Sequence, residues 1–177
     1  MLHALSRKMV LIGPLALMTV MFFIVMFLVD PAIDGGNGAS VIKLQLSFDK
    51  DAGREIVNTW GKSGIETFNQ WIFTDYIYAI SYSVFFASLL SFLILKKGKE
   101  NFLVYRIGVY LAFVAGLFDW VENTTELFFV NDPSDVSNAL FFLHSIVASA
   151  KWAAVPIALA YIVVLLTKKN RPHAQSL

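Results

Sequence analysis

Four long apolar runs set the strongest limit on how this chain can fold. They cover residues 9–29, 64–96, 101–130 and 133–168. A helix rises about 1.5 Å per residue, so roughly 20 residues cross a hydrocarbon core of about 30 Å. Inside lipid the backbone must satisfy its own hydrogen bonds, which a helix does. The sequence therefore predicts an all-α, polytopic membrane protein, a four-transmembrane-helix bundle that forms one membrane domain over residues 1–177.

The composition agrees with a lipid bilayer as the main partner of the chain. Hydrophobic residues make up 57% and charged residues 15%, whereas soluble domains are near a quarter charged. The formal net charge of +1 gives no basis for a nucleic-acid partner. Because there is no cysteine, disulfides and thiolate metal sites are excluded.

The first apolar run is interpreted as a retained helix and not as a signal peptide. At 21 residues, Met9 to Val29 is too long for the apolar part of a signal peptide, and Val29-Asp30-Pro31-Ala32 is a poor cleavage site. Pro14 is expected to be tolerated within this helix, as prolines in membrane helices often are.

Residues 30–63 are more polar and are predicted to form an outer, periplasmic loop. Gly35–Gly38 is expected to turn. Apolar and polar residues then alternate over 42–48, which predicts an extended strand lying along the bundle or pairing with another chain. Asp49 is expected to cap a short amphipathic helix that runs to Trp60. An interfacial lid without chemistry is the simplest role for this loop.

Local signals place the ends of the other helices. Ser63-Gly64-Ile65-Glu66 fits a capping box and predicts a helix start near residue 64, with an end at Lys96-Lys97-Gly98. Asp132 as N-cap and Pro133 at the first helical position predict the start of the last helix.

The basic residues predict the orientation, since Lys and Arg gather on the cytoplasmic side of short membrane loops. Four crossings bring three basic groups to one side, and the connection between the third and fourth helices has neither Lys nor Arg. Both termini are therefore predicted to be cytoplasmic. The three groups are Arg7 and Lys8; Lys96, Lys97, Lys99 and Arg106; and Lys168, Lys169 and Arg171.

An acidic stripe interrupts the third apolar run. Asp119, Glu122, Asn123 and Glu126 stand at i, i+3, i+4 and i+7, so a helix places them on one face. Ionisable groups within a bilayer are costly and commonly functional. We expect the other helices to surround this stripe.

Further polar residues are predicted to meet it. Asp75, Tyr78 and Tyr82 share one face of the second helix, and His144 and Lys151, seven apart, share one face of the fourth. Counted from the outer helix ends, Asp75 lies roughly 5–8 Å deep, Glu122 and His144 about 12 Å, Asp119 about 16 Å and Lys151 about 22–25 Å. Antiparallel packing would gather them in the outer half of the bundle.

Acids outnumber bases in this predicted pocket, and three explanations stay open. Some carboxyl groups are neutral, or Lys151 pairs with Asp119 or Glu122 as a structural link, or the excess charge binds a proton, a cation or a cationic ligand group. In a catalytic version, Glu122 or Asp119 would be the acid or base, His144 its proton partner and Lys151 an electrostatic stabiliser.

The motifs Trp60-Gly61, Asp75-Tyr76 followed by Tyr82, Asp119-x-x-Glu122-Asn123 and Lys151-Trp152 occur in this order. Together they resemble a set of small bacterial four-helix integral membrane proteins of uncharacterised function, over about residues 44–166. The resemblance implies the same architecture and a location in the bacterial inner membrane. It implies no activity and no residue roles.

The first functional hypothesis is that the pocket binds, and in an enzyme version transforms, a small amphipathic or lipid-like molecule. The second is a non-catalytic small subunit or assembly factor with a membrane-protein partner. The third is a component of a proton or cation pathway. No cofactor is identified, and His144 without a paired His motif gives no basis for a metal site.

Overall fold

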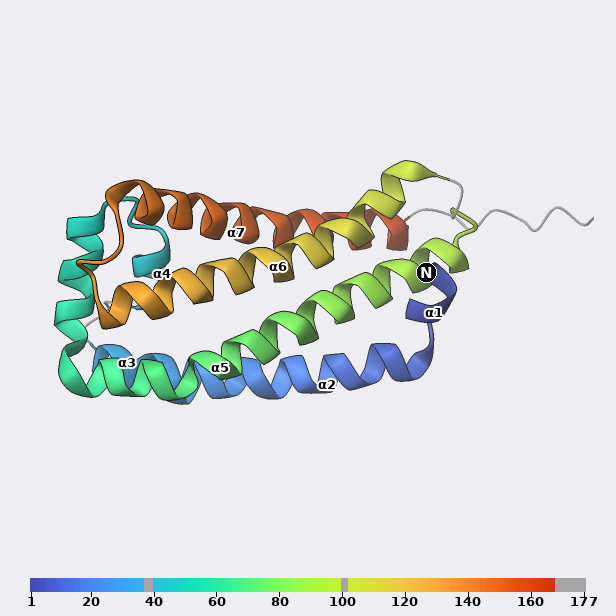
Figure 1. The fold of residues 1–177 in the computed structure, drawn as a ribbon. Helices are drawn as coiled ribbons and strands as arrows, with labels where there is room; N and C mark the ends of the chain where they lie inside the picture. The colour runs from blue at the N-terminus through green and yellow to red at the C-terminus, as the bar shows by residue number, and fades with distance from the viewer. Residues whose placement is uncertain (37–39, 100–101, 168–177) are drawn as a thin grey trace, which may run out of the picture.

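The chain is mostly helical over the residues that the computed structural model describes, which are 1–36, 40–99 and 102–167 (Figure 1). These parts contain no strand, which agrees with the predicted all-α class but not with the strand predicted over 42–48. Four helical stretches within them are long and apolar enough to cross a membrane: Lys8–Asp34, Lys50–Lys96, Leu103–Asn131 and Asn138–Thr167. The protein therefore has the architecture of a multi-pass membrane protein.

The first span is longer than the predicted 9–29 because a wide helical turn carries it past a proline. Pro31 has no backbone N–H, and a π-helical turn precedes it, in which the N–H of Asp30 donates to the carbonyl of Val25. Pro14 lies inside the helix without ending it. The elements are α1 (Leu2–Leu5), α2 (Lys8–Ile24), the π-helix η1 (Val25–Val29) and α3 (Asp30–Asp34).

The strand predicted over 42–48 is wrong, because this segment contains the short helix α4 (Val41–Gln45). Leu44 and Gln45 are both buried, and they follow Val41 at i+3 and i+4. A helical period therefore fits the buried positions, whereas strict alternation would have exposed Gln45. The predicted turn at Gly35–Gly38 begins with Gly35 and Gly36 at positive φ, and residues 37–39 lie outside the described part.

The two helices predicted over 49–60 and 64–96 form one element, α5 (Lys50–Lys96), broken at Gly61. Gly61 has φ 62° and ψ −172°, a conformation essentially restricted to glycine. The helix resumes directly after it, and not at the capping box. The predicted cap at Asp49 is confirmed: its carboxylate accepts from the N–H groups of Asp51 and Ala52, each at 2.9 Å.

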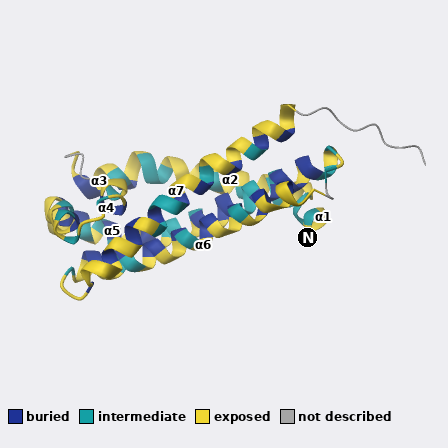
Figure 2. Cartoon of the chain, turned by 90° about the horizontal axis from the view of Figure 1, so that it is seen from above, coloured by how far each residue is buried: buried dark blue, intermediate teal, exposed yellow. Residues whose placement is uncertain are grey.

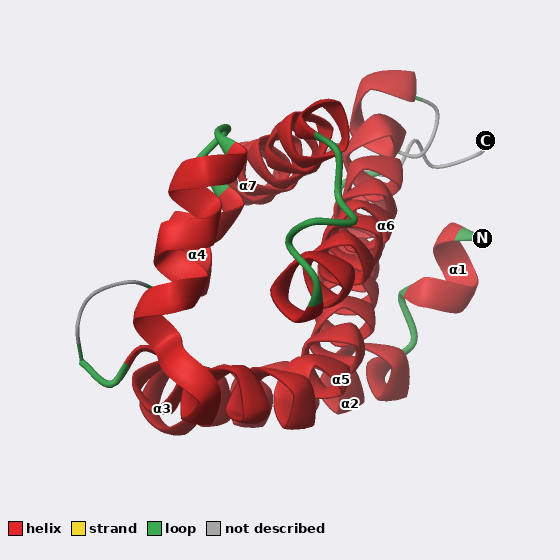
Figure 3. Ribbon diagram, turned by 60° about the vertical axis from the view of Figure 1, so that its left-hand side comes forward, coloured by secondary structure: helices red, strands yellow, loops and turns green. Residues whose placement is uncertain are grey.

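The first segment of α5, Lys50–Trp60, crosses the end of the bundle and defines what we call the loop end (Figures 1 and 3). At one side Gly53 abuts the ring of Phe141 in α7. At the other, just after the break, Gly64 lies against the carbonyl of Ile33 in α3, where a Cβ would collide. Glycine at both places lets this segment close over the helix ends.

The last two helices are α6 (Leu103–Asn131) and α7 (Asn138–Thr167). The predicted start of the last helix at 133 is wrong. Asp132 instead closes a turn by accepting from the backbone N–H and the hydroxyl of Ser134, and Ser137 takes the capping role by accepting from the N–H of Leu140 at 3.1 Å. The predicted helix ends at residues 101 and 168 lie outside the described part.

The long helices pack in sequence, α2 against α5, α5 against α6 and α6 against α7, while α2 and α7 make no comparably extensive contact. Close packing of α5 on α6 depends on Gly116, whose added Cβ would lie 2.7 Å from the hydroxyl of Ser83. Buried residues run along α5 and α6, whereas no residue of α2 is buried (Figure 2). Helix α2 is therefore an outer wall of the bundle.

Candidate binding site

The polar stripe of α6 forms the centre of the site. Asp119, Glu122, Asn123 and Glu126 are at most 3% exposed. They continue the buried face of α6 that Gly108, Ala112 and Gly116 form farther from the loop end. A single helical face therefore changes along its length from small residues, which let helices approach, to polar ones.

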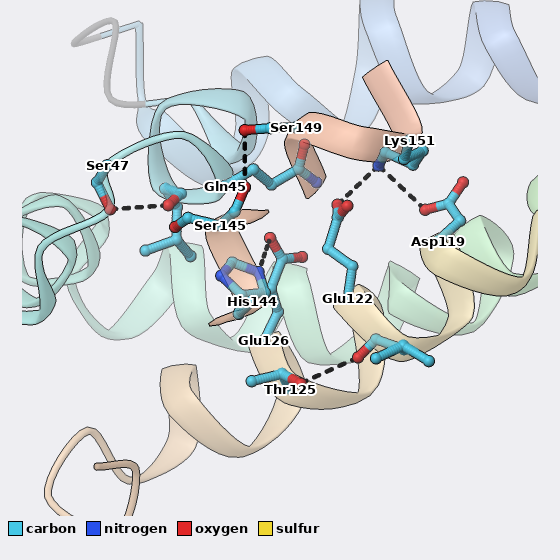
Figure 4. A network of polar contacts seen from close by, with 12 residues as sticks. Gln45, Ser47, Asp119, Glu122, Thr125, Glu126, His144, Ser145, Ser149 and Lys151 are labelled. Carbon is cyan, nitrogen blue, oxygen red and sulfur yellow. Dashed lines mark hydrogen bonds and ion pairs between the residues drawn. The ribbon is translucent and has the colours of Figure 1, made fainter. Parts of the chain in front are cut away.

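Lys151 joins α7 to this stripe. Its Nζ donates to Glu122 Oε1 at 2.7 Å and to Asp119 Oδ1 at 3.2 Å (Figure 4). All three side chains are at most 8% exposed. The late start of α7 at Asn138 brings Lys151 about 20 Å from that helix end, close to the level of Asp119, which is about 18 Å from Asn131.

His144 and Glu126 form a second, looser contact one layer nearer the loop end. The distance from His144 Nε2 to Glu126 Oε1 is 3.4 Å, and each side chain is 1% exposed (Figure 4). Neither carboxylate oxygen of Glu126 and neither ring nitrogen of His144 has a hydrogen-bond partner within the described chain. The same holds for the amide of Asn123. Buried polar atoms without partners are uncommon in proteins.

The predicted residues of α5 face the same region. Asp75 has Asn123, Asp119 and Lys151 as polar neighbours. Tyr78 and Tyr82 follow at one-turn intervals, with their ring centroids 5.4 Å apart and edge to face. The hydroxyl of Tyr82 is buried and has no hydrogen-bond partner in the described chain. The structure thus brings together all nine residues that sequence analysis selected.

A cavity of about 340 Å³ lies between α2 and α7 and reaches this cluster. Its wall combines apolar side chains of α2, η1 and α7 with polar groups of α5, α6 and α7. Asp75, Asp119, Glu126 and Lys151 form the charged part next to the cluster, and Asp30 of α3 is a further charged residue of the wall. The apolar part includes Met18, Phe22, Val25, Met26 and Val155. The volume is near the lower end for small-molecule sites, and the mixture of walls is typical of them.

The sequence analysis missed that the loop supplies part of the site. Gln45 of α4 lines the cavity and accepts a hydrogen bond from Trp152 Nε1 at 3.1 Å. The N–H of Phe48, a residue with φ 56°, donates to the hydroxyl of Ser145 at 3.2 Å. A helical rather than an alternating reading of 41–45 would have identified Gln45 as an inward-facing residue.

Among the described residues, no three His, Asp or Glu side chains are arranged to hold a metal ion. His144 lies 3.4 Å from Glu126, whereas Asp119 and Glu122 are bound to Lys151. The arrangement instead offers hydrogen-bond acceptors, one ammonium group and aromatic rings around an apolar space.

Comparisons of the chain with models of protein families, with curated proteins and with solved structures give no match. The resemblance to small bacterial four-helix membrane proteins therefore stays a prediction, and the functional argument depends on this site alone.

Proposed function

We propose that this protein is a membrane-embedded binding protein for a small amphipathic or lipid-like molecule. The ligand would place its apolar part along α2 and its polar part against the cluster of α5, α6 and α7. The proposal includes the bacterial inner membrane as the location.

One observation carries the proposal: the cavity has an apolar wall and a charged wall at the same time. Met18 and Met26 on the apolar side are flexible side chains that adapt to ligands of different shape. Asp119, Glu126 and Lys151 on the charged side are at most 6% exposed. A molecule with one apolar and one polar end matches both walls.

The position of the cavity also supports access from the bilayer. It lies where α2 and α7 lack extensive contact, and no residue of α2 is buried. A ligand dissolved in lipid could therefore reach the cluster between these two helices, without crossing water.

The proposed orientation puts both termini in the cytoplasm. In the described chain, α1 and the turn at Lys96–Gly98 lie at one end of the bundle, opposite the loop end (Figure 1). Arg7, Lys8 and Lys97 belong to that end, and clusters of basic residues favour the cytoplasmic side. The cavity cluster would then lie toward the periplasmic side.

Mass spectrometry of molecules that co-purify after gentle extraction tests the binding proposal. Val155→Trp should fill the cavity from α7, since Val155 lines it, whereas Val163→Trp adds the same bulk on an outward position that is 58% exposed. We expect an amphipathic molecule in the wild type and in Val163→Trp, reduced at least about tenfold in Val155→Trp. Equal retention in both variants would contradict the cavity as the site.

The extensive exposed apolar surface of α2 and η1 favours one alternative, a small subunit of a membrane complex. Phe23, Phe27 and Leu28 are each more than half exposed. If a partner covered this helix, the protein should be extracted as a stable hetero-complex with no co-purifying small molecule. A folded monomer that retains a ligand supports the binding function instead.

A further inference from the structure

Within this proposed function, the geometry points to the chemical class of the ligand: we propose that the cavity binds an aliphatic primary amine, with its ammonium group between Asp75 and Glu126. The inference depends on the cavity being a binding site, and it adds the identity of the polar end.

The four carboxylates of the cluster form two groups, one bound to Lys151 and one not. Lys151 donates to Asp119 and Glu122, at 3.2 and 2.7 Å, so these two acids share its ammonium group. Asp75 and Glu126 make no hydrogen bond to it, and both line the cavity. The cluster therefore has a matched half and a half that remains available to a ligand.

The part of the cluster that Lys151 does not bind contains polar atoms without hydrogen-bond partners. Glu126 is 1% exposed, and both its carboxylate oxygens lack a hydrogen-bond partner in the described chain. Tyr82 is 5% exposed, lines the cavity, and has a hydroxyl in the same condition. An ammonium group has three donors and could satisfy several of these acceptors at once. Charged hydrogen bonds of this kind are the strong ones.

Aromatic rings lie beside the carboxylates that Lys151 does not bind. Tyr78 and Tyr82 present two rings to the cavity, 5.4 Å apart and edge to face. Asp75 is on the same helix, one turn before Tyr78, and is among its neighbours. Cations are attracted to aromatic faces, and rings combined with carboxylates are a recurrent way to bind ammonium groups.

The same features disfavour other cations and other head groups. No three His, Asp or Glu among the residues the structure describes could hold a metal ion together. A ligand carboxylate or phosphate would face Asp75 and Glu126, and the one lysine is already bound to two acids. The volume of about 340 Å³ favours a single-chain amine over a two-chain aminolipid.

Matched probes in phosphatidylcholine nanodiscs test this inference on the full chain. Dodecylamine and dodecanol share a tail and differ in the head group, and binding is followed by tryptophan fluorescence, to which Trp71 and Trp152 on the cavity wall contribute. We expect the amine to bind at least about tenfold more tightly than the alcohol, as loss of a charged hydrogen bond would suggest. Adding phosphatidylethanolamine to the discs should compete only weakly, and strong competition would identify a two-chain aminolipid as the ligand and overturn the single-chain assignment.

Two variants and one control test whether Asp75 and Glu126 cause the preference for the amine. Glu126→Gln and Asp75→Asn keep side-chain size and should reduce the preference for the amine to less than about threefold, without changing dodecanol binding. Glu66→Gln removes an exposed acid elsewhere on α5, with a side chain 62% exposed, and should bind as the wild type does. Should one cavity variant fail to fold, the other still decides the outcome.

The outcomes separate the two proposals. Dodecanoate, which has a tail of similar length and a carboxylate head group, is the third probe. Equal binding of amine and alcohol, or tighter binding of dodecanoate, overturns the amine inference and leaves the cavity as a site for amphipathic molecules. Binding of none of the three probes, together with no co-purifying molecule, overturns the proposed function itself.

Discussion

Lys151 and Glu126 are the centres of two buried polar contacts in the same bundle, and they differ in how completely they are paired. Lys151 makes two charged hydrogen bonds, to Asp119 and Glu122. Glu126 has His144, at 3.4 Å, and Gln45 as polar neighbours, without a close hydrogen bond to either in the described chain. One contact is suited to hold helices together, and the other to receive a ligand.

The donors that reach each contact explain this difference, since both contacts border the same cavity. Lys151 and Asp119 line it together with Glu126 and Asp75. The ammonium group of Lys151 has three donors and reaches Glu122 and Asp119 from α7, whereas Glu126 and Asp75 make no hydrogen bond to it. These two acids therefore remain available to a ligand in the cavity.

The largest expected effect is at the paired contact. Lys151→Met should destabilise the fold by about 3–5 kcal/mol, because it leaves two buried carboxylates without their cation. Unfolding in mixed micelles measures this. The matched control is Lys62→Met, which removes a 92% exposed lysine with one partner at 3.9 Å, and no measurable change is expected.

A double variant checks that the cost comes from pairing. Lys151→Met with Glu122→Gln should be less destabilised than either single variant, because the isolated charge is removed with its partner. Additive costs would show that Lys151 and Glu122 contribute independently, and the contrast with Glu126 would then be lost.

A smaller effect is expected at the break that carries the first segment of α5 over the loop end. Gly61→Ala places a Cβ on a residue with φ 62° and ψ −172°, at a cost of about 1–3 kcal/mol. Gly13→Ala is the control, since Gly13 is helical with open space around it, and alanine there should be neutral or slightly stabilising. Thermal unfolding of both variants is measured with and without dodecylamine. The comparison shows whether the segment Lys50–Trp60 contributes to ligand binding at Glu126.

The contact between Glu126 and His144 is expected to contribute still less to the stability of the fold. Glu126→Gln and His144→Gln should each change the free energy of unfolding by less than about 1 kcal/mol, because no hydrogen bond is lost. The same unfolding assay applies. A cost equal to that of Lys151→Met would indicate that Glu126 and His144 form a structural pair, contrary to the comparison.

The smallest effect is expected at an exposed carboxylate outside the spans. Hydrogen bonds from the hydroxyl and the N–H of Ser134 hold the pKa of Asp132 below its ordinary value of 3.8. Since the folded pKa is the lower one, this stabilisation is present above about pH 3.8 and is lost as the pH falls through the folded pKa. Asp132→Asn should therefore differ slightly from the wild type near neutral pH and not at low pH, in unfolding measured from pH 6 to pH 2.

Much of the fold could be predicted because lipid imposes a simple rule on long apolar segments. The four spans, the cap at Asp49 and the shared face of Asp119, Glu122 and Glu126 follow from length, local hydrogen bonding and helical period. The errors were local. The segment containing Gln45 alternates like a strand but buries a helical face, and Asp132 closes a turn where it could also have capped a helix.

The candidate site was predicted as a set of residues but not as an arrangement. Helical spacing shows that Tyr78 and Tyr82 share a face, and it cannot show which acid reaches Lys151. That choice depends on the late start of α7 at Asn138, which shifts every residue of that helix along its axis. The contribution of Gln45 depends in turn on where the loop packs.

By itself, the sequence determined that this chain crosses a membrane as a set of helices and that one helix presents an acidic face to the others. Period and hydrophobicity suffice for this, since both act within a single segment. Only the tertiary structure decided that Lys151 binds Asp119 and Glu122 while Glu126 and Asp75 border a cavity. Partner choice among buried charges depends on the relative depth and spacing of separate helices, and these are set by packing across the bundle and not by any one stretch of chain.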